Sequence, residues 1–303
     1  MAAAVAFFNG RIGPERDIAI PLWDTGFVQG VTVSEQLRTF RGQLFRLRHH
    51  LERLERSLGI VGITMPYSLS EIEGHAESIA SQNHKLLTNG SDLGLAILVT
   101  PGPYSAFAPA DAPHEPTVCI HTYPLAFRLW ADKFESGQSL VTTSIRHVPE
   151  DCWPSALKCR SRMNYYLADA EARKIEKGSR ALMQDHDGFV TEATTANIVL
   201  ALSASELVAP PIEKTLPGIS VAVLRELASA HNVPFTTRDL TVDDVATAAE
   251  VFLTSTSPCM LPVVRLNGKP IGDGKPGPQY RKLLSAWSDL LGLDIAKQAR
   301  DFA

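Results

Sequence analysis

Cysteine is scarce in this chain, and neither acidic nor basic residues are in large excess. The 303 residues include four cysteines, none in a Cys-x-x-Cys pair, and a chain of this size does not need disulfides to hold its core. We therefore expect a reduced, cytoplasmic protein. The formal net charge of −4 provides no general attraction for nucleic acid or for a membrane surface, so neither is an expected partner.

Long hydrophobic runs and targeting signals are also missing. No apolar run approaches the roughly 20 residues that a membrane span needs. The apolar N-terminus has no basic segment and is too short for a secretory signal, so we interpret it as a first strand that meets a turn at Asn9-Gly10. These absences favour chemistry on small molecules.

Several common catalytic motifs are absent too. The sequence has no Gly-x-x-x-x-Gly-Lys-Ser/Thr loop, no His-Glu-x-x-His and no Gly-x-Ser-x-Gly, so phosphoryl transfer, zinc proteolysis and α/β-hydrolase chemistry have no visible machinery. One Gly-x-Gly-x-x-Gly run occurs at residues 272–277. It contains a proline and is not followed by room for a βαβ unit, and we interpret it as a loop before a last helix at residues 279–291.

The composition, with 45% hydrophobic and 20% charged residues, is that of a globular protein with enough material for two lobes. Period-two alternation predicts a strand at residues 31–40, and leucines on one helical face predict a helix at residues 49–58. We expect a mixed α/β (α+β) fold. Its parts are a smaller N-terminal α/β lobe at residues 1–123, a linker at 124–132 and a larger C-terminal lobe at 133–303.

The polar face of the predicted strand 31–40 is a first candidate site. Thr32, Ser34, Gln36 and Arg38 share this face. Periodicity alone favours a solvated edge of the sheet over a ligand pocket.

The order of residues around Lys158 is the most suggestive feature of the chain. This lysine ends an apolar run just before a predicted helix, and a hairpin follows whose returning strand is expected to carry Thr191, Glu192 and Asn197. Taken one at a time, such lysines and glutamates are usually solvated surface residues. Their order along the chain favours a functional role for both Lys158 and Glu192.

Two later turns have the chemistry of an anion site. Residues 216–220 run Leu-Pro-Gly-Ile-Ser into an apolar helix, where a glycine allows a tight turn and the first N–H groups of the helix are unpaired. Residues 254–257 place short hydroxyl side chains at a strand end. Each pattern is also common in turns that bind nothing.

These segments, together with His50-Leu51-Glu52-Arg53-Leu54, resemble the fold-type IV, or class IV, aminotransferases over about residues 7–291. That family includes branched-chain and D-amino-acid aminotransferases, R-selective amine transaminases and aminodeoxychorismate lyase. The resemblance implies a two-lobed fold and pyridoxal 5'-phosphate as the cofactor. It also implies a small-molecule amino donor, a 2-oxo acid acceptor, a homodimer and no metal ion.

The resemblance implies a role for each matching residue. Lys158 would form a Schiff base with the cofactor aldehyde and then move a proton between substrate and cofactor. Glu192 would keep the pyridine nitrogen protonated, and Arg53 would reach the phosphate unless it is a surface partner of a nearby glutamate. The other implied cofactor residues are Ile219, Ser220, Ser255 and Thr256. The implied substrate pocket consists of Ser34, Gln36, Arg38, Tyr104, Phe107 and Arg162.

Departures from the family patterns concern the substrate. Met163 stands near the place of a tyrosine that binds the ring hydroxyl in branched-chain enzymes, and the loop with Tyr104 and Phe107 lacks the arginine and histidine of bacillus-type D-amino-acid enzymes. The run through Arg162 is closer to aminodeoxychorismate lyase. Arg38 or Arg162 could bind a substrate carboxylate or pair with a structural acid. We expect transamination, with pyruvate-releasing elimination as the alternative and a catalytically silent cofactor-binding protein as a third reading.

Overall fold

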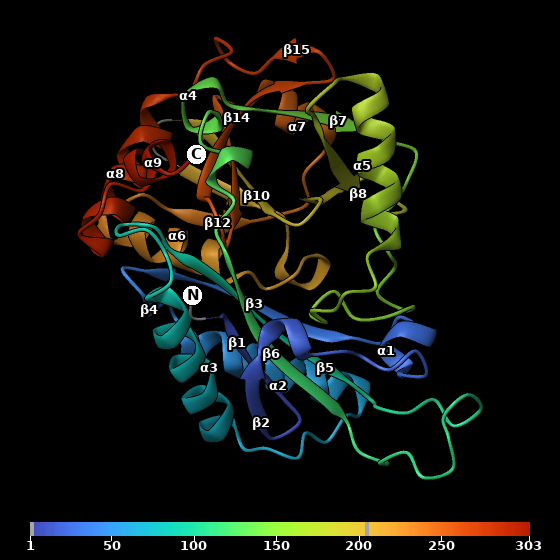
Figure 1. The fold of residues 1–303 in the computed structure, drawn as a ribbon. Coiled ribbons are helices and arrows are strands. Elements are labelled where there is room, and N and C mark those ends of the chain that lie inside the picture. The colour runs from blue at the N-terminus through green and yellow to red at the C-terminus, as the bar shows by residue number, and fades with distance from the viewer. Residues whose placement is uncertain (1–2, 204–205) are drawn as a thin grey trace. The chain divides into compact units, whose positions relative to one another are not determined.

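The computed structural model describes residues 3–203 and 206–303, and the chain divides into two compact units. The first unit comprises Met1–Leu125 and Leu157–Ser161, and the second comprises Ala126–Ala156 and Arg162–Ala303. Each unit combines a sheet with helices (Figure 1), so the predicted mixed α/β class is confirmed. The segment Leu157–Ser161, which carries Lys158, belongs to the first unit, so its predicted place in the C-terminal lobe is wrong.

The first unit is built on an antiparallel sheet with the strand order β2-β1-β6-β5-β3-β4. Asn9 and Gly10 both have positive φ, 42° and 83°, as the primed turns of tight hairpins require. The predicted hairpin is therefore confirmed. The strands are β1 (Val5–Phe8), β2 (Arg11–Pro14), β3 (Val33–Phe40), β4 (Gln43–Leu44), β5 (Leu93–Thr100) and β6 (Thr117–Pro124).

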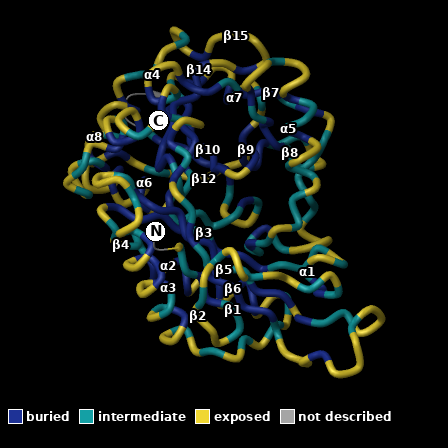
Figure 2. The backbone as a smooth tube through the Cα atoms, in the orientation of Figure 1, coloured by how far each residue is buried: buried dark blue, intermediate teal, exposed yellow. Residues whose placement is uncertain are grey.

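Two helices, α2 (Leu47–Val61) and α3 (Leu69–His84), pack on this sheet. Leu51, Leu54 and Leu58 of α2 are buried in one cluster with the inward residues of β3 and β5, which is the helical spacing that predicted this element. A capping box between Ser68 and Glu71 starts α3. The core of the unit therefore lies between sheet and helices, and Figure 2 shows the buried backbone following the strands. The short helices are η1 (Glu15–Asp17) and α1 (Thr25–Val28).

The second unit is built on a larger mixed sheet with the order β12-β11-β10-β13-β14-β7-β8-β9, and β15 pairs with β14. Three neighbouring pairs are parallel: β11 with β12, β14 with β7, and β7 with β8. The strands are β7 (Gln138–Thr142), β8 (Arg180–Gln184), β9 (Val190–Ala193), β10 (Asn197–Ser203), β11 (Glu206–Ala209), β12 (Phe235–Thr237), β13 (Glu250–Ser255), β14 (Cys259–Leu266) and β15 (Lys269–Pro270).

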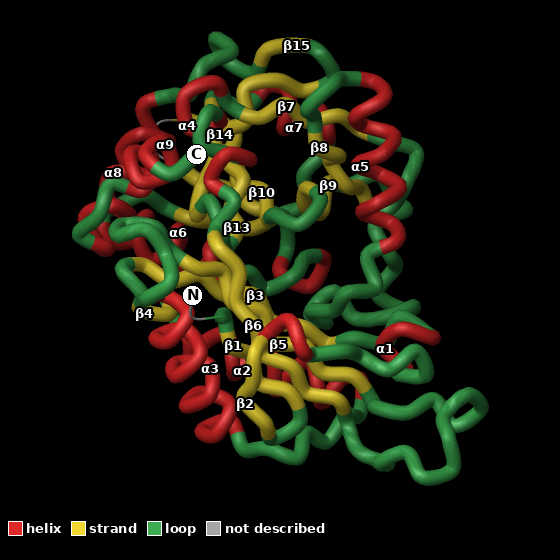
Figure 3. The backbone as a smooth tube through the Cα atoms, in the orientation of Figure 1, coloured by secondary structure: helices red, strands yellow, loops and turns green. Residues whose placement is uncertain are grey.

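The helices of the second unit lie against this sheet (Figure 3). Helix α5 (Met163–Ile175) packs on β7 and β8, and α6 (Ile219–Ala230) and α8 (Pro278–Leu291) pack on β13 and on each other. The remaining helices are η2 (Phe127–Leu129), α4 (Lys133–Ser136), η3 (Ile212–Lys214), α7 (Val242–Thr247) and α9 (Ile295–Asp301). None of the helices in the described part of the chain is long and apolar enough to cross a membrane.

One predicted element is wrong: Asn197 does not share the strand of Thr191 and Glu192. Strand β9 ends at Ala193, and the chain then reverses through Thr195, whose φ is +61°. The N–H of Ala193 and that of Ala196 each donate to the other residue's carbonyl, at 2.9 and 3.0 Å. This tight turn ends β9, so Asn197 becomes the first residue of the next strand, β10.

The glycine-rich run at residues 272–277 is a loop before α8, as predicted. The carboxylate of Glu250 accepts the N–H groups of Gln279 and Tyr280, both at 2.8 Å. A Cβ on Gly277 would lie 2.2 Å from the carboxyl carbon of Glu250. The start of α8 is therefore capped by a side chain of the protein, and the glycine makes room for that cap.

Candidate active site

Lys158 lies in an extended segment beside the start of β3 in the first unit. The Ser34 N–H donates to the Lys158 carbonyl at 3.0 Å, and the Arg160 N–H donates to the Thr32 carbonyl at 2.8 Å. Val33 and Cys159 form the antiparallel bridge between these bonds. Because opposite residues of an antiparallel pair share a face, Lys158 lies on the same face as Ser34. Its side chain is largely buried.

The polar face of β3 is shielded from solvent, so the solvated-edge reading is wrong. Ser34 and Arg38 are buried, and β3 is flanked by β5 and β4. Gln36 donates to the hydroxyl of Tyr123, while the Ser34 hydroxyl has no hydrogen-bond partner among the described residues. The Arg38 guanidinium stacks 3.9 Å from the centre of the Phe40 ring and donates from Nε to the Thr39 carbonyl at 3.2 Å. Buried polar groups of this kind are typical of a binding site.

The opposite face of β3 carries a buried charge cluster. Arg53 donates to Glu35 through Nε at 2.8 Å and through Nη2 at 3.0 Å, and His50 Nδ1 lies 2.5 Å from the same carboxylate. Arg53 is thus buried against a strand, and its reading as a surface partner is wrong. Burial by itself raises the pKa of Glu35, but the charges of Arg53 and Lys158 and the hydrogen bond of His50 lower it to about 2. The charge of Lys158 therefore acts on the cluster that holds Arg53.

Glu192 lies on β9 in the second unit, where its carboxylate is surrounded by donors. Tyr165 of α5 donates its hydroxyl to Oε1, and His147 Nε2 lies 3.5 Å from the same oxygen. Asn197 Nδ2 lies 3.4 Å from Oε2. Burial lowers the pKa of His147, but the hydrogen bond and charge of Glu192 outweigh burial, and the pKa is raised.

Asn197 joins Glu192 to the start of α6. Its Nδ2 donates to the Leu216 carbonyl at 2.8 Å. Gly218 is the N-cap of α6 without any side-chain cap, and a Cβ there would lie 1.9 Å from Asn197 Oδ1. Asn197 also pairs with Thr254 of β13. Asn197 thus connects Glu192 with the turn that leads to Ile219 and Ser220 and with the strand that leads to Ser255 and Thr256, and the cofactor roles of these five residues stay predictions.

The donors of this cluster fit an anionic ring cofactor such as pyridoxal phosphate. The first turn of α6 has backbone N–H groups without a side-chain cap, which is a ready phosphate site. Ser255 ends β13 and Thr256 lies in the turn to β14, next in the chain to Thr254, which pairs with Asn197. The buried Nη1 of Arg146 and the buried hydroxyl of Thr254 have no hydrogen-bond partner in the described residues. Such orphaned donors indicate a missing acceptor.

Two residues beside Glu192, His147 and Tyr165, and the buried guanidinium of Arg146 were missed from the sequence. Arg146 and His147 form a basic pair shortly after strand β7, and Tyr165 lies in the first turn of α5, two residues beyond the exposed Met163. The basic pair after an apolar run was a usable signal. Nothing in the spacing of Tyr165 pointed to Glu192, because their contact joins a helix to a strand 27 positions later.

The contacts of the remaining predicted pocket residues, Tyr104, Phe107 and Arg162, do not test their role in substrate binding. Tyr104 and Phe107 lie on the loop between β5 and β6, with ring centres 5.2 Å apart in an edge-to-face arrangement, and Phe107 is 66% exposed. Arg162 immediately precedes α5 and is half-buried. Their roles in substrate binding stay predictions.

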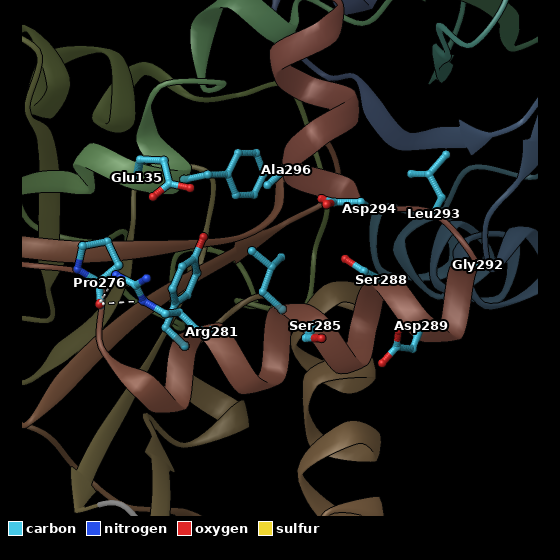
Figure 4. Close-up of a pocket in the computed structure, with 13 residues that line it drawn as sticks. Glu135, Pro276, Arg281, Ser285, Ser288, Asp289, Gly292, Leu293, Asp294 and Ala296 are labelled. Carbon is cyan, nitrogen blue, oxygen red and sulfur yellow. Dashed lines mark hydrogen bonds between the residues drawn. The ribbon is translucent and has the colours of Figure 1, made fainter.

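A separate pocket of about 540 Å³ lies among α4, α8 and α9 of the second unit (Figure 4). None of the predicted site residues lines it. Arg281, on its wall, donates to the carbonyl of Pro276 at 3.2 and 3.3 Å, and the buried hydroxyl of Tyr280 has a pKa raised by desolvation. Across residues 3–203 and 206–303, no group of three or more His, Cys, Asp or Glu side chains is arranged to hold a metal ion.

The chain belongs to the class IV aminotransferases, because the profile of amino-transferase class IV matches residues 32–266. It is 27% identical over 292 residues to D-alanine aminotransferase of Bacillus licheniformis, covering 96% of this chain and 98% of that protein. It is also 27% identical to a putative branched-chain-amino-acid aminotransferase of Methanocaldococcus jannaschii, covering 94% and 95%.

Solved structures show the same fold. Branched-chain amino acid aminotransferase of Escherichia coli superposes with a TM-score of 0.87 at 23% identity, over 96% of this chain and 95% of that one. Branched-chain aminotransferase of Thermoproteus uzoniensis, solved with norvaline, gives 0.79 at 22% identity, over 96% of each chain. The predicted fold type is thereby confirmed. Class IV aminotransferases are pyridoxal-phosphate-dependent transaminases, so the predicted reaction class and cofactor are confirmed as well.

Proposed function

We propose that this protein transfers an amino group between a D-amino acid or R-amine and a 2-oxo acid, with Lys158 as its catalytic residue. The observation that carries the assignment is the burial of Lys158 on the shielded polar face of β3, opposite Ser34. A lysine amine can form a Schiff base with an aldehyde and can then act as a base. When bound, the cofactor supplies the electron sink that stabilises negative charge at the substrate carbon.

The first unit supplies the covalent anchor and the moving proton. Lys158 would hold the cofactor through its amine, and the same amine would move a proton to and from the substrate carbon. Glu35 and His50 hold Arg53 in one orientation, and a guanidinium is the planar donor that would suit a phosphate oxygen.

The second unit supplies the groups that hold the ring and the phosphate. The buried carboxylate of Glu192 would accept the N–H of the pyridine ring and thereby keep that nitrogen protonated. The N–H groups of Ile219 and Ser220 and the hydroxyls of Ser255 and Thr256 would bind phosphate oxygens. Arg146, whose buried Nη1 has no hydrogen-bond partner among the described residues, would donate to another anionic oxygen of the cofactor.

The substrate assignment is supported by sequence similarity and by the character of the predicted pocket. D-alanine aminotransferases of Bacillus licheniformis and of Staphylococcus aureus are 27% and 28% identical to the chain. Ser34 and Gln36 are small or uncharged, and Tyr104 and Phe107 are aromatic, so they suit an apolar substituent. Arg38 and Arg162 remain the candidates for the substrate carboxylate.

The same proposal includes a cytoplasmic homodimer. Leu22 and Phe27 are 77% and 70% exposed beside an apolar pocket of about 340 Å³ in the first unit, and large exposed apolar groups of this kind mark association surfaces. Phe107 is exposed as well, as expected of a loop that closes a pocket in a second copy. The four cysteines are free thiols, which suits a reducing compartment.

A half-reaction with single amines tests the proposal. The protein loaded with pyridoxal phosphate is mixed with D- and L-alanine, with R- and S-1-phenylethylamine, and with aminodeoxychorismate, while absorbance follows conversion to the pyridoxamine form. Conversion by D-alanine or the R-amine supports the proposal. Conversion by the L- or S-enantiomers alone overturns the stereochemical assignment, and pyruvate from aminodeoxychorismate without conversion by any amine replaces transamination by elimination.

A further inference from the structure

The carboxylate of Glu192 is held unevenly at its two oxygens. Oε1 accepts the hydroxyl of Tyr165 and lies 3.5 Å from His147 Nε2, whereas Oε2 accepts a hydrogen bond of 3.4 Å from Asn197 Nδ2. A carboxylate oxygen has two acceptor sites. Among the described residues, two side chains thus face Oε1 and one faces Oε2, so Oε2 keeps capacity for one more strong donor.

The protons of His147 follow from its surroundings. Its Nδ1 lies 3.1 Å from the Val148 carbonyl, which can only accept, so Nδ1 carries a proton. Its Nε2 faces the anionic oxygen of Glu192 at 3.5 Å and the hydroxyl oxygen of Tyr165 at 3.3 Å. A proton on Nε2 turns both contacts into attractions, and the raised pKa of His147 agrees with that.

Both side chains are fixed by the fold rather than free to follow Glu192. The His147 N–H donates to the Gln184 carbonyl at 2.8 Å, which ties the segment to the end of β8. Tyr165 lies in the first turn of α5, a helix that packs on β7 and β8. Two rigid elements therefore converge on one carboxylate oxygen.

We propose that His147 and Tyr165 are positioning residues that hold Oε1 of Glu192 and thereby present Oε2 to the pyridine nitrogen of the cofactor. This inference rests on the proposed role of Glu192. It adds that His147 places a positive charge behind the carboxylate. The ring nitrogen would then donate to Oε2 of Glu192, which has a fixed direction and whose negative charge is partly balanced by His147.

Two variants with two matched controls test the proposal. Tyr165→Phe removes the hydroxyl and keeps the ring, and His147→Gln keeps hydrogen-bonding capacity but removes the charge. Tyr166→Phe, on the same helix, and His186→Gln, in the turn between β8 and β9, are the controls, because both of these side chains are exposed. The readouts are the Kd of the cofactor-free protein for pyridoxal phosphate and the pH midpoint of the absorbance change of the bound cofactor.

Both test variants are expected to raise the Kd about tenfold, the usual effect of losing a hydrogen bond to a charged group. The controls should stay within about twofold. His147→Gln should also raise the pH midpoint, because a nearby cation disfavours protons on the cofactor, and Tyr165→Phe should leave it unchanged. The groups that face His147 are Glu192, Tyr165 and Asp185. Arg146 adjoins His147 in the chain and the charge of Arg180 also acts on Glu192, but both variants keep these two cations, so the shift reports the charge of His147.

The possible failures are distinguishable. If the Glu192→Gln protein binds pyridoxal phosphate with the same Kd as the wild-type protein, the proposed role of Glu192 is wrong. If Glu192→Gln weakens binding while folded Tyr165→Phe and His147→Gln proteins keep the wild-type Kd and midpoint, only the positioning inference is overturned. Tyr165→Phe changes no ring volume, so it decides the matter even if the histidine variant does not fold.

Discussion

Glu35 and Arg53 form a two-point ion pair in the interior of the first unit, with N–O distances of 2.8 and 3.0 Å. Glu35 belongs to β3 and Arg53 to α2, so the pair joins sheet and helix where the hydrophobic core surrounds them. A buried pair is costly to desolvate, and its geometry holds the guanidinium in one direction. The pair therefore fixes the side chain that we assign to the cofactor phosphate.

Replacement of Glu35 by Gln should destabilise the cofactor-free protein by about 3 kcal/mol, because it leaves the buried charge of Arg53 without its partner. Urea unfolding of the two proteins measures the difference. The control is Glu52→Gln, since Glu52 pairs with Arg48 on the surface, and this change should stay within about 0.5 kcal/mol. Equal effects of the two substitutions would contradict the structural role of the pair.

The same pair should make stability depend on acid pH. The pKa of Glu35 is lowered from 4.5 to about 2 in the folded protein, so the folded state binds this proton more weakly than the unfolded state. The stabilisation is complete above pH 4.5 and is lost as the pH falls towards 2, a change of about 3 kcal/mol. Unfolding measured at several pH values should show the difference between wild type and Glu35→Gln shrinking over that interval. If the difference in free energy of unfolding between wild type and Glu35→Gln stays constant over this pH range, the lowered pKa of Glu35 is wrong.

Gly218→Ala should weaken cofactor binding and destabilise the second unit by about 1–3 kcal/mol, because the new Cβ would lie 1.9 Å from Asn197 Oδ1. The matched control is Gly74→Ala in α3, where a Cβ meets no atom within 4 Å. That change should stabilise the protein by about 0.5–1 kcal/mol, as usual in a helix interior. Thermal unfolding and cofactor titration measure both effects, and a harmless Gly218→Ala would disprove the contact.

Arg146→Met should have opposite effects on stability and on cofactor affinity. The unpaired Nη1 of Arg146 is buried, and such a donor costs free energy when it has no acceptor. The cofactor-free protein should therefore be no less stable than wild type, while the Kd for pyridoxal phosphate rises at least tenfold. Urea unfolding and absorbance titration decide this. A loss of stability without a change in Kd would show that Arg146 serves the fold alone.

The elements of the fold were predictable where one local pattern determined them. The turn at Asn9-Gly10, the leucine face of α2 and the alternation along β3 each follow from a few neighbouring residues. The position of Asn197 did not follow, because the reversal before β10 depends on Thr195 taking a left-handed conformation. Threonine favours strands, so the sequence pointed to one longer strand.

The candidate site was predictable in its residue types and less so in its contacts. Lys158 and Glu192 were found by their order along the chain and by the family resemblance. The burial of Arg53 against Glu35 depends on the packing of α2 on β3. The contacts of Glu192 depend on three separate segments, which carry His147, Tyr165 and Asn197. Contacts of this kind have no fixed sequence spacing, so periodicity does not reveal them.

The most direct test of the central claim identifies the lysine that binds the cofactor. The protein loaded with pyridoxal phosphate is treated with sodium borohydride, which reduces the carbon–nitrogen double bond to a stable single bond, and the modified peptide is located by mass spectrometry. We predict modification at Lys158, and none after Lys158→Ala, while Lys214, an ion-paired lysine of the second unit, stays unmodified. Stoichiometric modification of another lysine, or none in the wild-type protein, would contradict the account.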